Sequence, residues 1–313
     1  MSLNGFADDV HSQFGEDGIL AEVLRRIDAS PLARPAEAPR WCVEFGAWDG
    51  IHLSNTRHLV ESHGYCAVLI EGDPDRFADL VANSPSDRVH AIKAWVAIEG
   101  DLRLDALLAS TPLPRDFDVL SIDVDGVDHH LWRSLVDHRP RIVCIEFNPT
   151  IPNRVRFVQP PDPSVQWGSS PRSIVELATD KGYDLVACTQ VNLVFTSSEF
   201  TDAVLDGRRL TLDDVRDDGE AGISVFLAFD GTVHADRELI GFPWQGLRSR
   251  PLTLHSLPRR LRRVGPRPRW VRLASILPRR VVGRLRIMVR PRRLRRHWSG
   301  WTPEADEAAS HGK

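Results

Sequence analysis

Two acidic residues that follow short apolar runs are the side chains of this chain best suited to bind a ligand. Residues 41–43 form the first run, which reaches Glu44 and then turns through Gly46 and Gly50. A second apolar run further along the chain ends at Glu71. In an open parallel sheet a ligand binds outside the carboxyl ends of the strands, where such an acid can accept hydrogen bonds from both ribose hydroxyls. The pattern predicts a site for a nucleoside-containing cofactor.

A sheet is needed to position these residues, and the hydrophobic pattern predicts one. Strand-like runs alternate with helical patterns, which indicates parallel strands joined by right-handed crossovers. Only two residues separate the last two strands, so these strands must pair antiparallel. We therefore expect an α/β fold in which five parallel strands precede a terminal antiparallel pair, with helices on both faces. The expected strands are 41–46, 66–71, 89–97, 117–122, 141–147, 184–189 and 192–197, and the expected helices are 17–28, 55–62, 102–109, 127–137, 171–181 and one that begins at Pro74.

Composition limits the class of protein. The chain has 313 residues, of which 42% are hydrophobic, so one large domain with extensions can bury a substantial core. No apolar run approaches the roughly 18 residues of a membrane span, and the acidic, polar N-terminus is unlike a secretory signal. We expect a cytoplasmic protein whose cysteines are free, buried thiols, because they form no Cys-x-x-Cys pair. These cysteines are Cys42, Cys66, Cys144 and Cys188.

Several short motifs resemble a known family, the FkbM-type methyltransferases, in their order and spacing. The resemblance covers roughly residues 10–200. It implies the fold of the class I S-adenosylmethionine-dependent enzymes, whose seven-stranded sheet ends in an antiparallel pair. Trp48 departs from the pattern, because the usual class I loop has glycine at that position. The motifs are SQFGEDG (12–18), EFGAWDG (44–50), SNT (54–56), IEGDP (70–74), SIDVDG (121–126) and IEFNP (145–149).

The resemblance implies that S-adenosylmethionine lies against the first two strands. Glycine in the turn would let the backbone approach the methionine part of the cofactor. Trp95, just past the third strand, would stack on the adenine, with packing in the core as the alternative. The segment that contains Gln13 would lie against the cleft. The predicted cofactor-binding residues are Glu44, Gly46, Ala47, Gly50, Glu71, Gln13 and Trp95.

The tips of the fourth and fifth strands are expected to carry the chemistry. Asp123 and Glu146 stand at these tips, and Asn148 follows closely. Their hard oxygen atoms suit Mg²⁺, which would align and acidify a substrate hydroxyl; direct hydrogen bonding without metal is the alternative. Asp123 or His129 would act as the base, although His129 and His130 cannot both face the site from one helix. Asp123, Glu146 and His129 are the predicted catalytic residues, and Asp123, Glu146 and Asn148 the predicted metal ligands.

Charge divides the chain into an acidic body and a basic end. Residues 248–297 contain 18 arginines and no acidic residue, whereas residues 1–247 carry an excess of acids. Such a segment, with a short helix at 279–288, would contact an anionic membrane surface, so the protein would be peripheral to the inner membrane surface. The alternatives are RNA binding, docking on the acidic body and an unstructured extension. The membrane contact and the unstructured extension are favoured over RNA. We expect an N-terminal helical segment and linker (1–40), a cofactor-binding core (41–200), an extension of that core (201–247) and the arginine-rich tail (248–313).

Three functions fit these observations. The first is an S-adenosylmethionine-dependent O-methyltransferase that acts on a hydroxyl of a sugar, glycolipid or secondary metabolite, with a small-molecule or glycan substrate. The second is a nicotinamide-dependent oxidoreductase on a similar sheet, which the terminal antiparallel pair and the missing Gly-x-Gly-x-x-Gly disfavour. The third is a non-catalytic adaptor that uses the fold to present the basic tail.

Overall fold

The structure, a computed structural model, describes residues 2–84 and 87–219 and, further along the chain, five short strands. The chain divides into two compact units. One consists of Met1–Ala221 with Thr302–Lys313, and the other of Gly222–Trp301. Every residue predicted to bind cofactor, metal or substrate lies in the first unit.

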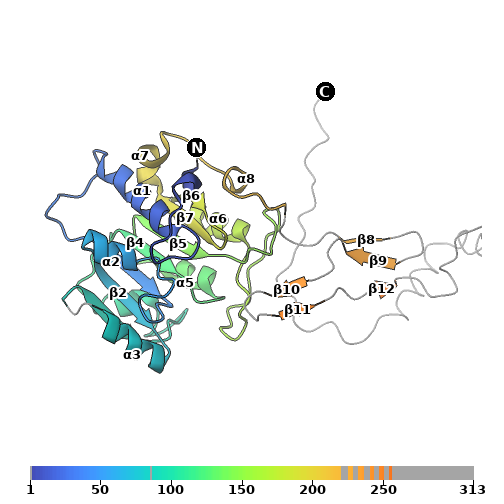
Figure 1. Ribbon diagram of the computed structural model, residues 1–313, viewed down its shortest axis with the longest axis horizontal. Coiled ribbons are helices and arrows are strands. Elements are labelled where there is room, and N and C mark those ends of the chain that lie inside the picture. Colours follow the sequence, from blue (N-terminus) through green and yellow to red (C-terminus); the bar gives the residue numbers. More distant parts are fainter. Residues whose placement is uncertain are drawn as a thin grey trace, which may run out of the picture. The chain divides into compact units, whose positions relative to one another are not determined.

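A seven-stranded sheet forms the centre of the first unit (Figure 1). Its strand order is β3-β2-β1-β4-β5-β7-β6. All neighbouring strands from β3 to β5 are parallel, and β7 is antiparallel to both β5 and β6. The predicted Rossmann-like sheet with a terminal antiparallel pair is therefore confirmed. The strands are β1 (Trp41–Phe45), β2 (Cys66–Glu71), β3 (Val89–Lys93), β4 (Val119–Ile122), β5 (Ile142–Glu146), β6 (Tyr183–Cys188) and β7 (Asn192–Ser197).

The helices begin and end where local chemistry dictates. Pro74 begins its helix as predicted, and the Asp73 carboxylate caps it by accepting two backbone N–H groups. The helix expected at 127–137 ends at Ser134 instead, because the Asp105 carboxylate accepts the N–H groups that follow, from Val136 and Asp137. The helices are η1 (Leu3–Phe6), α1 (Glu16–Asp28), α2 (Arg57–His63), α3 (Pro74–Asn83), α4 (Leu104–Leu108), α5 (Asp128–Ser134), α6 (Pro171–Asp180), η2 (Ser198–Phe200), α7 (Thr201–Leu205) and α8 (Leu212–Val215).

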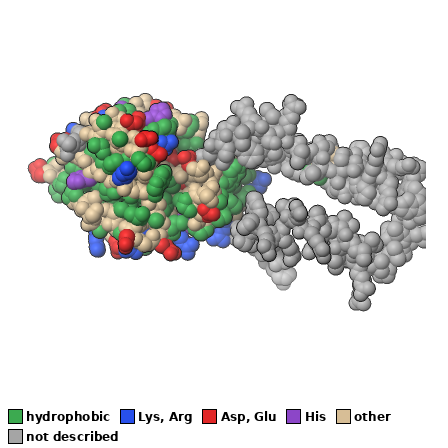
Figure 2. All heavy atoms as spheres, turned by 90° about the horizontal axis from the view of Figure 1, so that it is seen from below, with side chains coloured by type: hydrophobic (Ala, Val, Ile, Leu, Met, Phe, Trp, Pro, Cys, Tyr) green, Lys and Arg blue, Asp and Glu red, His purple; other side chains and the backbone are tan. Residues whose placement is uncertain are grey.

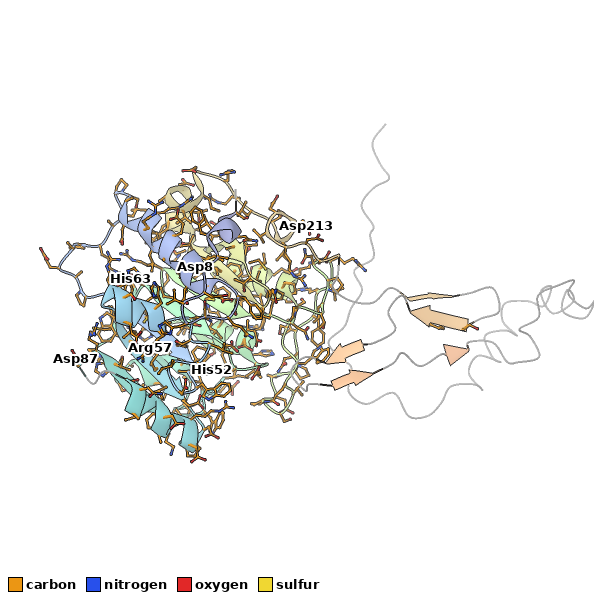
Figure 3. All side chains as sticks on the ribbon, in the orientation of Figure 1. Asp8, His52, Arg57, His63, Asp87 and Asp213 are labelled. Atoms are coloured by element: carbon orange, nitrogen blue, oxygen red, sulfur yellow. The ribbon has the colours of Figure 1, made fainter. Side chains whose placement is uncertain are left out.

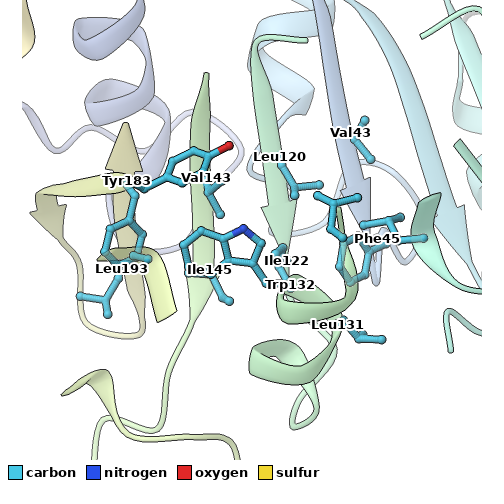
Figure 4. Packing of buried hydrophobic residues seen from close by; sticks show 14 of the residues in the cluster. Val43, Phe45, Leu120, Ile122, Leu131, Trp132, Val143, Ile145, Tyr183 and Leu193 are labelled. Atoms are coloured by element: carbon cyan, nitrogen blue, oxygen red, sulfur yellow. The ribbon is translucent and has the colours of Figure 1, made fainter. Parts of the chain in front are cut away.

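Both faces of the sheet are buried under helices. Alternate strand residues point to opposite faces, so Val43 and Phe45 belong to one apolar cluster and Cys42 to the other. Helices α4, α5, α6 and α8 supply the first cluster, and Figure 4 shows Trp132 of α5 among the strand side chains there. Helices α1, α2, α3 and α7 supply the second cluster. The sheet is thus held from both sides, which leaves its edges and strand tips to carry function.

The cysteines are free as predicted, although Cys66 is less buried than expected. All the cysteines are free; three are buried and Cys66 is half-buried. On the face drawn in Figure 2, acidic and basic side chains of the described residues are interspersed with apolar ones. Among the described helices none is long and apolar enough to cross a bilayer.

The second unit is described only through its strands. Strand β8 (Val225–Leu227) pairs antiparallel with β9 (Thr232–Ala235), and β12 (Leu254–His255) adds a third strand. A separate pair consists of β10 (Ile240–Phe242) and β11 (Leu247–Ser249). The helix expected at 279–288, and most of the arginine-rich tail, lie outside the described residues, so the predicted membrane contact stays a prediction.

Candidate functional site

The predicted acids meet at one edge and on one face of the sheet. Glu44, Glu71 and Glu146 lie at the carboxyl ends of β1, β2 and β5, and Asp123 follows β4 directly. The strand alternation puts all of them on the face of the second apolar cluster, the one that α1 and α2 cover. Parallel strands with matched registers therefore bring together acids that are far apart in the sequence.

The turn after β1 passes directly over the tip of β4. Gly46 has a φ of +76°, and an added Cβ would lie only 1.8 Å from the Asp123 carbonyl oxygen. The N–H groups of Gly46 and Ala47 both donate to the Ile70 carbonyl at the end of β2, at 3.1 and 3.2 Å. A side chain at Gly46 is thus excluded by both the backbone angle and the space. The turn forms a tight backbone cradle above three neighbouring strand tips.

Trp48 keeps the backbone shape that glycine would provide. Its φ is +49°, a conformation that costs a bulky residue about 1–2 kcal/mol. The Trp48 N–H donates to one oxygen of Glu71 at 2.9 Å, and the Asp73 N–H donates to the other at 2.7 Å. The departure from the family pattern at Trp48 therefore changes the side chain while the turn is retained. Gly50 completes the turn with a φ of +73°.

Glu71 is held rigidly but keeps acceptor capacity. The residue is 4% exposed, and each of its carboxylate oxygens receives one backbone N–H. A carboxylate oxygen has two acceptor positions, so both oxygens can still accept a hydroxyl. This geometry suits an acid that binds the two hydroxyls of a ribose.

Trp95 lies on the backbone beside Glu71. An added Cβ on Gly72 would lie 2.2 Å from the indole ring, so the ring covers the residue that follows the acid. Trp95 is 68% exposed, which excludes the alternative that it packs in the core. An exposed aromatic ring next to the buried Glu71 carboxylate has a free face on which a planar group could stack.

Glu44 is bonded to the loop that leads into α2. Its buried carboxylate accepts hydrogen bonds from the Ser54 hydroxyl at 2.5 Å, the Thr56 hydroxyl at 2.6 Å and the Asn55 N–H at 2.9 Å. Burial raises the pKa of Glu44. The Asn55 amide in turn donates to the Ser121 hydroxyl of β4 at 3.1 Å. Glu44 therefore fixes the loop that starts α2, and its contact with the cofactor stays a prediction.

Three carboxylates crowd together at the tips of β4 and β5. One oxygen each from Asp123, Asp125 and Glu146 lie within 4.8 Å of one another. Burial, followed by the charges of Asp128 and Asp125, raises the pKa of Asp123 well above its usual range. Asp125 has a φ of +57°, a left-handed conformation that strains the backbone at this residue. This arrangement concentrates negative charge, and it can accept a proton or bind a cation.

Asp128 holds the turn that presents this cluster. Its carboxylate accepts the N–H of Val124 at 2.9 Å and that of Gly126 at 2.8 Å. Burial raises the pKa of Asp128 to about 6. The residue is therefore structural, as its place at the start of α5 suggests.

The predicted metal ligand Asn148 does not join the cluster. Its side-chain oxygen accepts both the Thr150 N–H at 2.9 Å and the Thr150 hydroxyl at 2.6 Å, and its amide donates to the Trp167 carbonyl at 2.7 Å. Both acceptor positions of that oxygen are occupied within the loop. The third carboxylate of the cluster comes from Asp125, which is not among the predicted ligands. The signal for it was the acid–x–acid–glycine pattern of residues 123–126.

The predicted base His129 is buried and is not one of the three residues of the carboxylate cluster. It is 7% exposed, and burial lowers its pKa to about 4, so the ring is neutral near pH 7. Among the described residues its Nδ1 has no hydrogen-bond partner, and no hydrogen bond or ion pair joins the ring to Asp123. The neighbouring His130 contacts the 148–170 loop instead, with its Nε2 2.7 Å from the Gln159 carbonyl oxygen. His129 therefore lacks the contacts expected of a general base in this geometry.

The N-terminal motif folds onto the same edge of the sheet. Glu16 is 1% exposed and accepts hydrogen bonds from Thr189 at 2.6 Å and from Asn192 at 3.0 Å, in and after the turn between β6 and β7. Asn192 is the register partner of Glu146. Gln13 is exposed and lies in a hollow shared with Gln190 of that turn. The motif thus approaches the site from the β5 side, and the structure brings Gln13 to Gln190 rather than to Glu71.

Comparisons with known proteins concern the fold alone. No protein-family model matches the chain, and no curated protein matches its sequence. Similar solved structures include LepI in complex with S-adenosylmethionine (13% identity, TM-score 0.37, 61% of this chain and 49% of that chain) and the methyltransferase domain of METTL16 (12%, 0.36, 57% and 64%). Another is an O-methyltransferase family protein from Burkholderia thailandensis (12%, 0.36, 58% and 59%). The match spans about half the length of LepI, and at these identities the chemistry of the chain must come from its own strand tips.

Proposed function

We propose that this chain is an S-adenosylmethionine-dependent O-methyltransferase that acts on a hydroxyl of a sugar, glycolipid or secondary metabolite, as the FkbM-like motifs suggest. The observation that supports this most is the gathering of carboxylates beneath a glycine turn at the strand tips. S-adenosylmethionine carries a sulfonium and an ammonium group, which such a field attracts. The same field repels the anionic pyrophosphate of a nicotinamide dinucleotide, which disfavours the oxidoreductase alternative.

The chain's own residues fit this cofactor from one end to the other. Trp95 would stack on the adenine, and Glu71 would accept the two ribose hydroxyls. The turn at Gly46 and Ala47, which packs so closely on the Asp123 carbonyl that Gly46 has no room for a Cβ, would lie against the methionine part. When bound, the cofactor supplies an activated methyl group, and the protein positions a hydroxyl near it and excludes water.

Asp123 is the residue we assign as general base. Its raised pKa brings the carboxylate closer to the working pH than an ordinary aspartate, which strengthens it as a proton acceptor. Glu146 lies within the same cluster and would orient the hydroxyl by hydrogen bonding. His129 is not given this role, because its pKa is lowered to about 4 and it is not part of the cluster.

A divalent cation is an optional part of this proposal. Asp123, Asp125 and Glu146 each offer a carboxylate oxygen, and their mutual distances of up to 4.8 Å suit Mg²⁺. The ion would lower the pKa of a bound hydroxyl and so assist its deprotonation. If the ion takes part, methyl transfer falls on chelation with EDTA and returns with added Mg²⁺; transfer that is unaffected by EDTA assigns the whole task to the side chains.

Calorimetric titration of the purified chain with S-adenosylhomocysteine and with NAD tests the proposal. Saturable binding of the first and none of the second is expected. Replacing Glu71 by Ala should weaken S-adenosylhomocysteine binding by about 1.5–3 kcal/mol, because hydrogen bonds to a charged acceptor are lost. Glu71→Gln keeps an acceptor and should weaken it less.

Glu37→Ala is the matched control, since Glu37 is exposed in the linker before β1. Thermal unfolding of each variant separates lost affinity from lost folding, because Glu71 also holds the two turns beside it. Unchanged affinity in a folded Glu71→Ala variant contradicts the ribose assignment. Failure of the wild type to bind S-adenosylhomocysteine favours the adaptor alternative.

A further inference from the structure

A hollow of about 590 Å³ opens beside the N-terminal motif. Asp8, Asp9, Gln13 and Phe14 line it from the loop before α1, and Gln190 lines it from the turn between β6 and β7. Its volume exceeds that of a monosaccharide and lies within the range of small-molecule sites. The proposed function assigns no residue to this space.

The loop that lines the hollow is fixed in advance. One oxygen of Asp17 accepts the N–H groups of Val10, His11 and Ser12 at 2.7–3.0 Å, and Glu16 accepts the Phe14 N–H at 2.9 Å. Glycine at position 15, with a φ of +92°, packs against Ala7, which leaves no space for a side chain. A ligand therefore binds without having to order this wall, which favours affinity.

The hollow lies at the edge of the sheet that carries the chemistry. Gln190 stands between Thr189 and Asn192, and Glu16 binds both of these residues. Asn192 pairs in register with Glu146, and the charge of Glu16 is close enough to raise the pKa of Asp123. The hollow is therefore connected to the strand tip of Glu146 through Gln190, Asn192 and the buried Glu16, while its own lining consists of the N-terminal loop and Gln190.

The lining has a distinctive chemistry. In the described part of the chain, the side chains of Asp8, Gln13 and Gln190 have no hydrogen-bond partner, while Asp9 accepts the Ser12 hydroxyl and the N–H of residue 15. Amides and carboxylates bind hydroxyl groups, and the Phe14 ring offers an apolar face. The two aspartates attract a cation, and the lining residues include no Lys, Arg or His.

We infer that this hollow binds the methyl acceptor, and that the acceptor is a polyhydroxylated molecule that bears a protonated amine, such as an amino sugar. The inference rests on the proposed function, because it assigns the hollow to that reaction. It also reassigns Gln13 from the cofactor to the acceptor. Phosphorylated or carboxylated sugars are excluded as preferred acceptors by charge.

Three trisaccharides of similar size and different charge test this inference. The glucosamine trisaccharide is cationic, the N-acetylglucosamine trisaccharide neutral and the galacturonic acid trisaccharide anionic. Titrated into the full chain with saturating S-adenosylhomocysteine, the cationic sugar should bind about tenfold more tightly than the neutral one, from two exposed ion pairs, and the anionic sugar most weakly. The preference should decline as salt is added.

Variants locate the binding. Asp8→Asn should reduce the preference for the cationic sugar about threefold to fivefold, as expected for one exposed ion pair. Gln13→Ala and Gln190→Ala should weaken the binding of all three trisaccharides to a similar extent. Asp87→Asn is the control, because Asp87 is an exposed acid at a separate place on the same unit, away from Asp8 (Figure 3).

The results separate this inference from the proposed function. If S-adenosylhomocysteine binds but the sugars bind equally or not at all, or if Asp8→Asn behaves like Asp87→Asn, the inference is wrong and the proposed function stands. If S-adenosylhomocysteine does not bind, the proposed function fails. A charge-ordered series in that case leaves a sugar-binding hollow without the reaction, and the assignment to a methyl acceptor is withdrawn.

Discussion

The strand tips fall into two halves that treat their carboxylates in opposite ways. In the half formed by β1 and β2, Glu44 and Glu71 receive hydrogen bonds from backbone N–H and hydroxyl groups of the turns around them. In the half formed by β4 and β5, Asp123, Asp125 and Glu146 crowd one another. Burial raises the pKa of Glu44 and of Asp123 alike, but at Asp123 the charges of Asp128 and Asp125 add most to the effect of burial. The acids of the first half are surrounded by hydrogen-bond donors, whereas those of the second half are close to other carboxylates.

The difference teaches where the fold trades stability for reactivity. Donors around Glu71 fix the position of a binding group and stabilise the turns that carry it. Crowded carboxylates destabilise the folded state when they ionise, and evolution retains such arrangements at sites of proton transfer. The strained backbone at Asp125 adds to the same pattern. We therefore call β1–β2 the holding half and β4–β5 the reacting half.

The largest effect is expected for Asp123→Asn, which removes the proposed base from the reacting half. Methyl transfer from labelled S-adenosylmethionine to any hydroxylated acceptor that the wild type methylates should fall about 10²–10⁴-fold. Stability should rise at the same time. Because the folded state raises the pKa of Asp123, ionisation there opposes folding, so the wild type loses stability as the pH rises above the ordinary aspartate range. The gain of the variant, measured by urea unfolding, should be present at neutral pH and vanish below about pH 4.

Asp105→Asn provides the opposite case within the same unit. The Asp105 carboxylate accepts the N–H of Val136 at 2.7 Å and contacts His138 at 2.9 Å, and although burial opposes the shift, these contacts lower its pKa. Because the pKa of Asp105 is lower in the folded state, its ionised form stabilises the fold above the ordinary aspartate range. This stabilisation is lost as the pH falls, so Asp105→Asn should be less stable than the wild type at neutral pH. If Asp105→Asn and Asp123→Asn change the free energy of unfolding in the same direction at neutral pH, the distinction between hydrogen-bonded and crowded acids is wrong.

The next effect concerns the turn that joins the two halves. Gly46→Ala should destabilise the chain by about 3 kcal/mol or more, because the added Cβ meets the Asp123 carbonyl oxygen as well as a disfavoured φ. Gly100→Ala isolates the angle, since Gly100 has a φ of +81° but nothing within 4 Å of its added Cβ. It should cost only about 1 kcal/mol in urea unfolding. Similar losses for both variants would mean that the turn does not press on the reacting half.

The sequence predicts the strands of the two halves better than it predicts which side chains form the site. Strands Cys66–Glu71 and Asn192–Ser197 have the expected bounds, because buried β-branched runs between turn residues have few alternatives. Parallel pairing then places acids at a common edge. The acid–x–acid–glycine pattern of residues 123–126 could have pointed to Asp125, but the turn of the Asn148 side chain into its own loop could not be read from the sequence. The preformed hollow near Gln13 likewise depends on how the loop before α1 folds back onto Asp17 and Glu16, which residue types alone do not specify.

The smallest effect is expected at the outer end of the holding half. Trp95 is 68% exposed and covers Gly72, so Trp95→Ala should leave the unfolding midpoint nearly unchanged. Stacking on the adenine should nevertheless be lost, which raises the dissociation constant of S-adenosylhomocysteine about threefold to tenfold, since an aromatic pair contributes about 0.5–1.5 kcal/mol. Trp95→Phe keeps a ring and should recover most of the affinity in calorimetry. If Ala and Phe bind alike, the ring serves only the backbone of β2, and Glu71 holds the nucleoside without it.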